Sequence, residues 1–163
     1  MTPAPSSPAV VGAGAWGTAL ACVLAQRYPD VRLWVYEPEL AQEMGQVREN
    51  RTYLPGVRLP EGVRPTPSLE EALGGRGLVI LVVPSHAFRA VLQRARAWLA
   101  PGALVVSATK GIEVDGLATM SAVMREVLAD QPTDQAVLSG PSFAREVAEG
   151  RPTAVVAAAR ESQ

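Results

Sequence analysis

The chain has 163 residues, of which 48% are hydrophobic and 19% charged, and its formal net charge at pH 7 is −1. This length suits one domain with a substantial core. The even charge balance gives no basic surplus for nucleic acid or for an anionic membrane surface, and no apolar stretch is as long as a membrane span. The single cysteine, Cys22, cannot form an internal disulfide, and the N-terminus does not resemble a secretory signal. We therefore expect a cytoplasmic protein with no nucleic-acid or membrane partner.

The first half of the chain predicts two strand–helix pairs after a flexible tail at residues 1–8 that is rich in proline and serine. In chain order we expect strand 9–13, helix 15–27, strand 31–36, helix 38–49 and, capped by Ser68, helix 68–73. Residues 50–67 are rich in proline and glycine and predict a long loop. A loop of that length inside a compact domain is usually functional or disordered.

The second half continues the alternation. In chain order we expect strand 78–83, helix 86–99, strand 103–107, helix 117–129, strand 136–139, helix 142–149 (capped by Ser142) and strand 153–159. Alternating strands and helices indicate an α/β fold, a doubly wound and mostly parallel sheet of the Rossmann type. We therefore expect one dinucleotide-binding domain over residues 9–163.

Three glycines, Gly12, Gly14 and Gly17, follow the first strand with the spacing G-x-G-x-x-G and open the first helix. In this arrangement the first glycine permits a tight turn, the second lets the backbone approach a pyrophosphate, and the third lets the helix pack close to the strand. The phosphates would bind the free N–H groups at the N-terminus of the helix. The sequence therefore predicts a dinucleotide site here; the alternative is a purely structural turn.

Glu37 directly follows the second predicted strand, twenty residues after Gly17. A carboxylate at this position accepts hydrogen bonds from the ribose hydroxyls of NAD and repels the 2′-phosphate of NADP, and the preceding Tyr36 offers no guanidinium to compensate. NAD is therefore the preferred cofactor, with NADP as a second candidate. Alternatively, Glu37 points to solvent and Arg32 or Arg48 binds the 2′-phosphate.

Further polar features follow the other predicted strands: Pro84-Ser85, Lys110 and Gly140-Pro141-Ser142. Ligands of open parallel sheets bind outside the carboxyl ends of the strands, so these features should meet the glycine turn at one edge. Of the fifteen lysine and arginine residues, Lys110 is the single lysine. An ammonium group there can hold a phosphate or polarise a carbonyl oxygen, the alternative being a solvated surface lysine.

Other candidates have structural explanations that compete with functional ones. Residues 140–142 form either an ordinary helix cap or an anion site. The single histidine, His86, lacks an orienting carboxylate nearby in the sequence and is interpreted as a wall of the cofactor site or as structural. The aromatic residues Trp16, Tyr36 and Phe88 follow strand ends and are candidates to pack on the cofactor, but packing in the core is the default for each, most strongly for Phe88. No metal site is expected.

Five segments together resemble the N-terminal half of NAD(P)-dependent glycerol-3-phosphate dehydrogenase. They lie in the same order along the chain: Gly12–Ala21, Asn50 with Tyr53–Gly56, Val82–Ser85, Ala108–Glu113, and Ser139–Ala144 followed by Glu146-Val147. The resemblance implies hydride transfer between sn-glycerol 3-phosphate and dihydroxyacetone phosphate, which serves glycerophospholipid precursor synthesis.

The resemblance also implies site residues, added here to the glycine turn, Glu37 and Pro84. The implied cofactor contacts are Ala15, Trp16, Tyr36, Lys110 and Ala144. The implied substrate contacts are Lys110, which would position the substrate, together with Gly140 and Ser142. One departure concerns the end of the second strand, where many bacterial members carry basic residues and this chain has Tyr36-Glu37.

The family also has a C-terminal helical domain, which supplies a second lysine as proton acceptor and groups that bind the substrate phosphate. That domain is absent from these 163 residues, so we expect the cofactor-binding half of a dehydrogenase that is nearly inactive alone. The alternative is a stand-alone NAD-binding module with a sensing or partner-binding role. A related reductase of the phosphogluconate type would share the fold but not the Thr109-Lys110-Gly111 segment. A homodimer is a further possibility for the oligomeric state.

Overall fold

The computed structural model describes residues 7–159. Its strands are β1 (Pro8–Val11), β2 (Val31–Trp34), β3 (Glu49–Asn50), β4 (Leu54–Arg58), β5 (Val63–Thr66), β6 (Leu78–Leu81), β7 (Leu104–Ser107), β8 (Asp134–Ser139) and β9 (Val156–Ala159). Its α-helices are α1 (Ala15–Leu24), α2 (Pro38–Val47), α3 (Leu69–Leu73), α4 (Ser85–Ala95), α5 (Met120–Val127) and α6 (Ala144–Ala148), and a 3₁₀ turn, η1 (Arg96–Trp98), follows α4.

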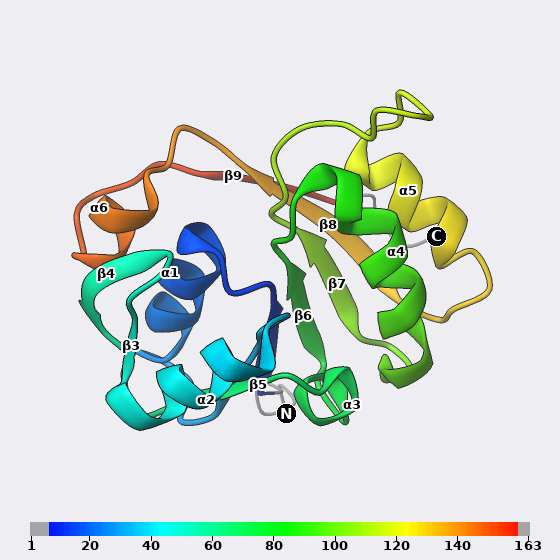
Figure 1. The fold of residues 1–163 in the computed structure, drawn as a ribbon. Coiled ribbons are helices and arrows are strands. Elements are labelled where there is room, and N and C mark those ends of the chain that lie inside the picture. The colour runs from blue at the N-terminus through cyan, green and yellow to red at the C-terminus, as the bar shows by residue number, and fades with distance from the viewer. Residues whose placement is uncertain (1–6, 160–163) are drawn as a thin grey trace, which may run out of the picture.

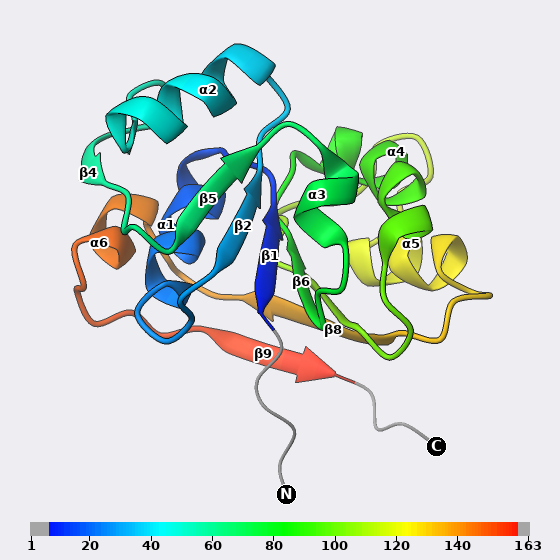
Figure 2. The ribbon, with the colours of Figure 1, turned by 90° about the horizontal axis from the view of Figure 1, so that it is seen from below.

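Seven strands form one sheet in the order β5-β2-β1-β6-β7-β8-β9. The view from below shows β5, β2, β1 and β6 side by side (Figure 2). Every neighbouring pair is parallel except β8 and β9, which are antiparallel. This confirms the predicted doubly wound, mostly parallel sheet. The last strand differs from a simple continuation of the pattern, because β9 runs back along β8 at the edge of the sheet.

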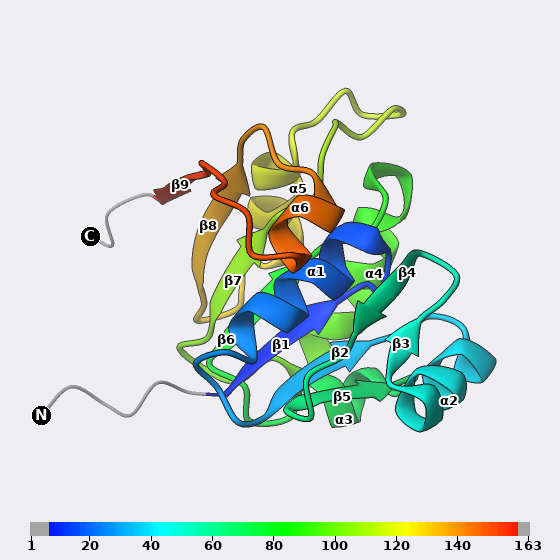
Figure 3. The same ribbon diagram turned by 90° about the vertical axis from the view of Figure 1, so that its left-hand side faces the viewer.

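Helices cover both faces of the sheet (Figure 1). Helices α1, α2 and α6 lie on one face, which Figure 3 turns toward the viewer, and α3, α4 and α5 lie on the other. Strand β1 is buried on both faces. Val10 packs in the core with α1 and α2, whereas Ala9 and Val11 pack in the core with α3, α4 and α5. Successive side chains of a strand point to opposite faces, so a central strand must be apolar throughout.

The order of the strands places the ligand-binding edge. From β1 the chain winds through α1 and β2 toward β5, and from β6 it winds in the opposite direction toward β8. The neighbouring strands β1 and β6 are therefore the point where the winding reverses. Outside the carboxyl ends of these two strands, the diverging connections leave a crevice.

The segment 50–67 is not the long loop expected from its composition. It contains the hairpin β3–β4 and the strand β5, which pairs in parallel with β2. The buried side chains of Leu54, Leu59 and Val63 supply the apolar contacts that hold this segment on the domain. Pro65 is tolerated in β5 because that strand is the outer edge of the sheet, where one row of backbone N–H groups needs no partner.

Two helix starts also differ from prediction. Helix α5 begins at Met120 with Thr119 as its cap, because Leu117 has a left-handed backbone with φ of 47°. Helix α6 begins at Ala144 after Phe143, so the prediction of Ser142 as the cap of this helix was wrong. The first strand includes Pro8, and residues 1–6 of the predicted tail lie outside the described residues. In the described part of the chain, no helix combines the length and the apolar character needed to cross a membrane.

Candidate cofactor-binding site

A cavity of about 540 Å³ lies at the carboxyl ends of β1, β2 and β6. Its wall consists of the glycine turn, the residues that end β2 and β6, one side of α4, and Tyr53 from the β3–β4 hairpin. This size is within the range of natural ligand pockets. The crevice that the topology predicts is thus an actual cavity.

The three glycines of the turn have different surroundings. A side chain at Gly12 would place its Cβ 2.5 Å from the carbonyl oxygen of Val82, and one at Gly17 would place it 1.9 Å from the carbonyl oxygen of Gly12. A Cβ at Gly14 would meet nothing within 4 Å. Gly12 and Gly17 are therefore required by packing within the protein, whereas the space beside Gly14 is open to a ligand.

The N-terminus of α1 faces this open space with unpaired donors. Gly14 is the N-cap and offers no side-chain cap, and the first turn carries no acidic residue. The first backbone bond of the helix runs from the N–H of Thr18 to the carbonyl oxygen of Gly14 at 3.0 Å. The preceding N–H groups of the first turn have no acceptor within the helix, and such groups bind anions readily. The turn therefore fits a pyrophosphate.

Asn50 holds the glycine turn from the opposite side, a role that the sequence did not reveal. Its side chain is fully buried, and its Nδ2 donates to the carbonyl oxygen of Ala13 at 2.8 Å and to Oγ1 of Thr18 at 2.9 Å. Its Oδ1 accepts from the backbone N–H of Tyr53 at 3.0 Å. One buried amide therefore connects the strand–helix turn to the β3–β4 hairpin.

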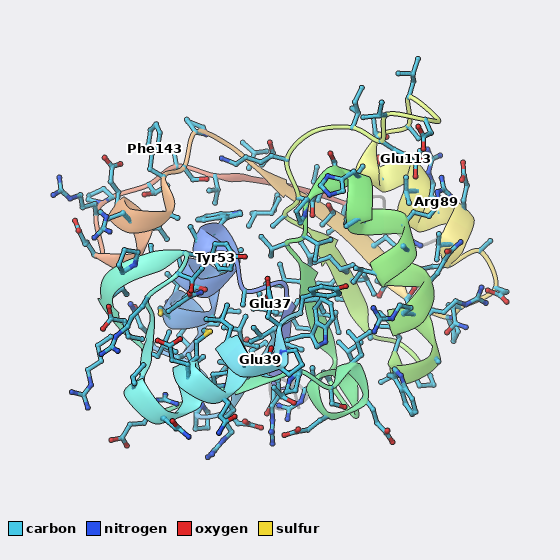
Figure 4. The ribbon with its side chains drawn as sticks, viewed as in Figure 1. Glu37, Glu39, Tyr53, Arg89, Glu113 and Phe143 are labelled. Carbon is cyan, nitrogen blue, oxygen red and sulfur yellow. The ribbon has the colours of Figure 1, made fainter. Side chains whose placement is uncertain are left out.

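Glu37 lies at the cavity beside Tyr36 and Tyr53. The hydroxyl of Tyr53 donates to Oε1 of Glu37 at 3.1 Å, and the two side chains point toward each other in Figure 4. This hydrogen bond to the carboxylate raises the pKa of Tyr53. Tyr36 is 69% exposed and meets the ring of Trp34 edge to face, with the ring centroids 6.0 Å apart.

The two arginines considered as alternatives for a 2′-phosphate are engaged elsewhere. Arg32 pairs with Glu71 at 2.7 Å and with Asp30 at 3.4 Å. Arg48 donates to the backbone carbonyl of Pro60. Neither is among the residues that line the cavity, whereas Arg94 of α4, which the sequence did not single out, is one of them.

Lys110 lies close to the N-terminus of α1 from the other direction. Its Nζ donates to the backbone carbonyl of Ser142 at 3.2 Å and lies 5.9 Å from the centroid of the Trp16 ring. A second cavity, of about 550 Å³, is lined by Lys110 together with Gly140. The predicted substrate residues thus gather on one side of the glycine turn, although Ser142 takes part through its carbonyl oxygen.

The loop that carries Lys110 is fixed by contacts on both sides. Before it, Thr109 donates to the carbonyl oxygen of Val83 at 2.9 Å. After it, Arg89 of α4 donates two hydrogen bonds to Glu113, of 2.7 and 2.9 Å (Figure 4). Arg89 also pairs with Glu126 of α5 at 2.8 Å. Hydrogen bonding to Arg89 lowers the pKa of Glu113. The sequence did not reveal this ionic cluster.

The remaining candidates occupy varied positions. Pro84 and His86 line the first cavity at the start of α4, whereas Phe88 is fully buried in the core. Ala144 opens α6, a helix that packs on α1, but it lines neither cavity. Cys22 is buried, and this burial raises the pKa of its thiol to about 11. Between residues 7 and 159 there is no group of three or more histidine, cysteine or acidic side chains placed to hold a metal ion.

The doubly wound sheet, the glycine turn at the start of α1 and the acidic residue after β2 define a Rossmann-type dinucleotide-binding domain. The family described as "NAD-dependent glycerol-3-phosphate dehydrogenase N-terminus" matches residues 8–163. The chain belongs to this family.

Individual relatives agree with the family match. A protein from Geobacter sp. (strain M21) named "Glycerol-3-phosphate dehydrogenase [NAD(P)+]" is 52% identical over 152 residues, which are 93% of this chain and 45% of that protein. The crystal structure of glycerol-3-phosphate dehydrogenase from Coxiella burnetii is 38% identical, with a TM-score of 0.86, over 96% of this chain and 47% of that one. The chain therefore spans about half the length of the relatives it matches.

The similarity to a more distant structure shows the fold alone. Glycerol-3-phosphate dehydrogenase from Saccharomyces cerevisiae is 24% identical, with a TM-score of 0.85, over 98% of this chain and 49% of that one. None of these relatives supports the alternative of a stand-alone sensing module.

Proposed function

We propose that this chain is the cofactor-binding part of an NAD(P)-dependent glycerol-3-phosphate dehydrogenase. In the whole enzyme, hydride would pass between sn-glycerol 3-phosphate and dihydroxyacetone phosphate. This reaction would supply the precursor of glycerophospholipids, in a reducing cytoplasm. The single observation that carries the proposal is the space beside Gly14. There a side chain would meet no protein atom within 4 Å, in front of a helix N-terminus that has no side-chain cap.

A bound nicotinamide dinucleotide would supply the hydride acceptor or donor. The chain's own residues would hold it in parts. The N–H groups at the start of α1 bind the pyrophosphate, and Glu37 accepts hydrogen bonds from the adenosine ribose. Pro84 and His86 form the wall opposite, since both line the same cavity as the glycine turn.

Lys110 would act on the substrate side. It lies near Trp16 at the start of α1 and lines a cavity with Gly140, so its ammonium group would contact a substrate held beside the cofactor. A positive charge there attracts the substrate phosphate and stabilises negative charge that develops on the carbonyl oxygen. The resemblance assigns the proton acceptor to the helical domain, so Lys110 has a positioning and electrostatic role.

We propose further that NAD is preferred over NADP. The carboxylate of Glu37 faces the place of a 2′-phosphate, and like charges a few ångströms apart repel by about 1–4 kcal/mol at effective dielectrics of 80 to 20. Arg94 lines the same cavity and partly offsets this repulsion. We therefore expect a preference for NADH of about one decade with measurable binding of NADPH, smaller than Glu37 alone would give.

Replacement of Gly14 by valine tests the proposal. The backbone at Gly14 has φ of −64° and ψ of 179°, which any residue adopts, and the added side chain meets open space, so the domain should still fold. The branched side chain would instead occupy the pyrophosphate position and abolish NADH binding, measured by titration calorimetry.

Gly45→Val is the matched control, because Gly45 in α2 also has nothing within 4 Å of an added Cβ and lines no part of the cavity. This control should bind NADH like the original chain. Unchanged NADH binding by Gly14→Val would exclude the glycine turn as the pyrophosphate site.

A further inference from the structure

The contact between Tyr53 and Glu37 joins two separate segments of the wall of the proposed cofactor site. Tyr53 comes from the β3–β4 hairpin and Glu37 from the end of β2, and both line the main cavity with the glycine turn. Neither the composition nor the cofactor signature gives this hairpin a part in binding. Its position at the cavity requires an explanation.

The base of the hairpin is held firmly. Asn50, fully buried, binds the backbone N–H of Tyr53 and also the glycine turn, as described above. Glu49 Oε1 accepts from the N–H of Gly56 at 2.8 Å across the hairpin, and Arg145 of α6 donates to the carbonyl oxygen of Pro55 at 2.9 Å. The backbone that carries the Tyr53 phenol is therefore fixed relative to the N-terminus of α1.

Glu37, in contrast, has a competing position for its carboxylate. It is the N-cap residue of α2, where a negative charge gains from the helix dipole. In the structure its side chain makes no such cap bond and turns instead to the hydroxyl of Tyr53. The carboxylate therefore lies at the cavity, in contact with the phenol.

We propose that Tyr53 is a specificity-determining positioning residue that holds the carboxylate of Glu37 against the adenosine ribose. The tyrosine hydroxyl donates a hydrogen bond to Oε1 of Glu37, and the other carboxylate oxygen accepts hydrogen bonds from the ribose hydroxyls. A carboxylate fixed in this way binds the two ribose hydroxyls of NAD and cannot turn away from a 2′-phosphate. The proposal rests on the proposed function, because it assumes that the adenosine end of a dinucleotide lies in this cavity.

Tyr53→Phe tests the proposal in the full 163-residue chain, with dissociation constants for NADH and NADPH as the readout. The variant retains the ring and the backbone contacts, and the side chain is 43% exposed, so we expect unchanged thermal unfolding. Loss of one hydrogen bond should weaken NADH binding about three- to tenfold, while NADPH binding stays equal or becomes tighter. The ratio of the two affinities should therefore shift toward NADPH.

A double-mutant cycle with Glu37→Gln separates positioning from a general structural role. If Tyr53 acts through the carboxylate, adding Tyr53→Phe to Glu37→Gln should leave the NADH/NADPH ratio unchanged. Tyr28→Phe is the matched control, because Tyr28 lies outside the cavity and should change neither affinity.

The outcomes distinguish the two proposals. If the original chain binds neither dinucleotide, the proposed function and this inference are both wrong. If it binds NADH and Tyr53→Phe leaves the ratio unchanged, or shifts it equally in the Glu37→Gln background, only the role of Tyr53 is wrong.

Discussion

At the scale of single residues, the cavity is lined by one acidic and one basic side chain, Glu37 and Arg94. In the proposed site, Glu37 would disfavour a 2′-phosphate, whereas Arg94, from the last turn of α4, would attract it. The arginines that the sequence offered, Arg32 and Arg48, have other partners. If the proposed site is correct, the balance between Glu37 and Arg94 sets the affinity for NADP relative to NAD.

Replacement of Arg94 by alanine should separate the two cofactors. Because its guanidinium is exposed and screened by salt, we expect NADPH to bind about three- to tenfold more weakly and NADH to be nearly unaffected. Fluorescence titration of both cofactors at low and high salt measures this difference. Arg27→Ala, a change of another exposed arginine after α1, is the control. An equal loss for NADH and NADPH would show that Arg94 does not contact the 2′-phosphate.

Single residues also show where sequence reasoning stops. The close packing at Gly12 and Gly17 depends on local spacing, so it could be predicted from the sequence, whereas the pyrophosphate position beside Gly14 stays a prediction. Asn50 could not be assigned, since its side-chain partners lie 37 and 32 residues away along the chain. Ser142 was assigned wrongly as a cap, because a serine before a helical pattern resembles a cap whichever residue begins the helix.

At the scale of elements, the ionic cluster of Arg89, Glu113 and Glu126 attaches the loop that carries Lys110 to α4 and α5. The pKa of Glu113 is held below its ordinary value of 4.5 by the hydrogen bonds from Arg89. A carboxyl group whose pKa is lowered by folding stabilises the protein above its ordinary pKa, and this contribution is lost as the pH falls through the lowered value.

Glu113→Gln should therefore lower the melting temperature at neutral pH, and the gap to the original chain should close as the pH falls below 4.5. Thermal unfolding followed by circular dichroism at a series of pH values measures the gap. Glu61→Gln, which changes an exposed carboxylate in the turn between β4 and β5, should show little gap at any pH. A Glu113→Gln gap that is constant with pH would mean that the charge of Glu113 contributes nothing.

The elements themselves differ in how well they could be predicted. Strands β1 and β6 are continuous apolar runs because both of their faces are buried, and this pattern is visible in the sequence. The segment that forms β3, β4 and β5 was predicted as a loop, since its pairing depends on β2 and on buried leucines distant in sequence. The proline and glycine residues within this segment favoured the prediction of a loop, although the segment forms an edge strand and a hairpin.

At the scale of the whole molecule, the order of the strands brings the predicted site residues to one edge of the sheet. The glycine turn, Glu37 and Pro84 line one cavity, and Lys110 lines a second cavity with Gly140. The strand order itself was not predicted in detail, but the rule that ligands bind at the carboxyl ends of parallel strands was sufficient to group these residues.

The proposed site depends most on the position of the dinucleotide, and a crystal structure of this chain grown with NADH tests that position directly. We expect the pyrophosphate at the N-terminus of α1 beside Gly14, and the hydroxyls of the adenosine ribose on Glu37. NADH bound away from α1, or with its adenosine ribose remote from Glu37, would contradict the account.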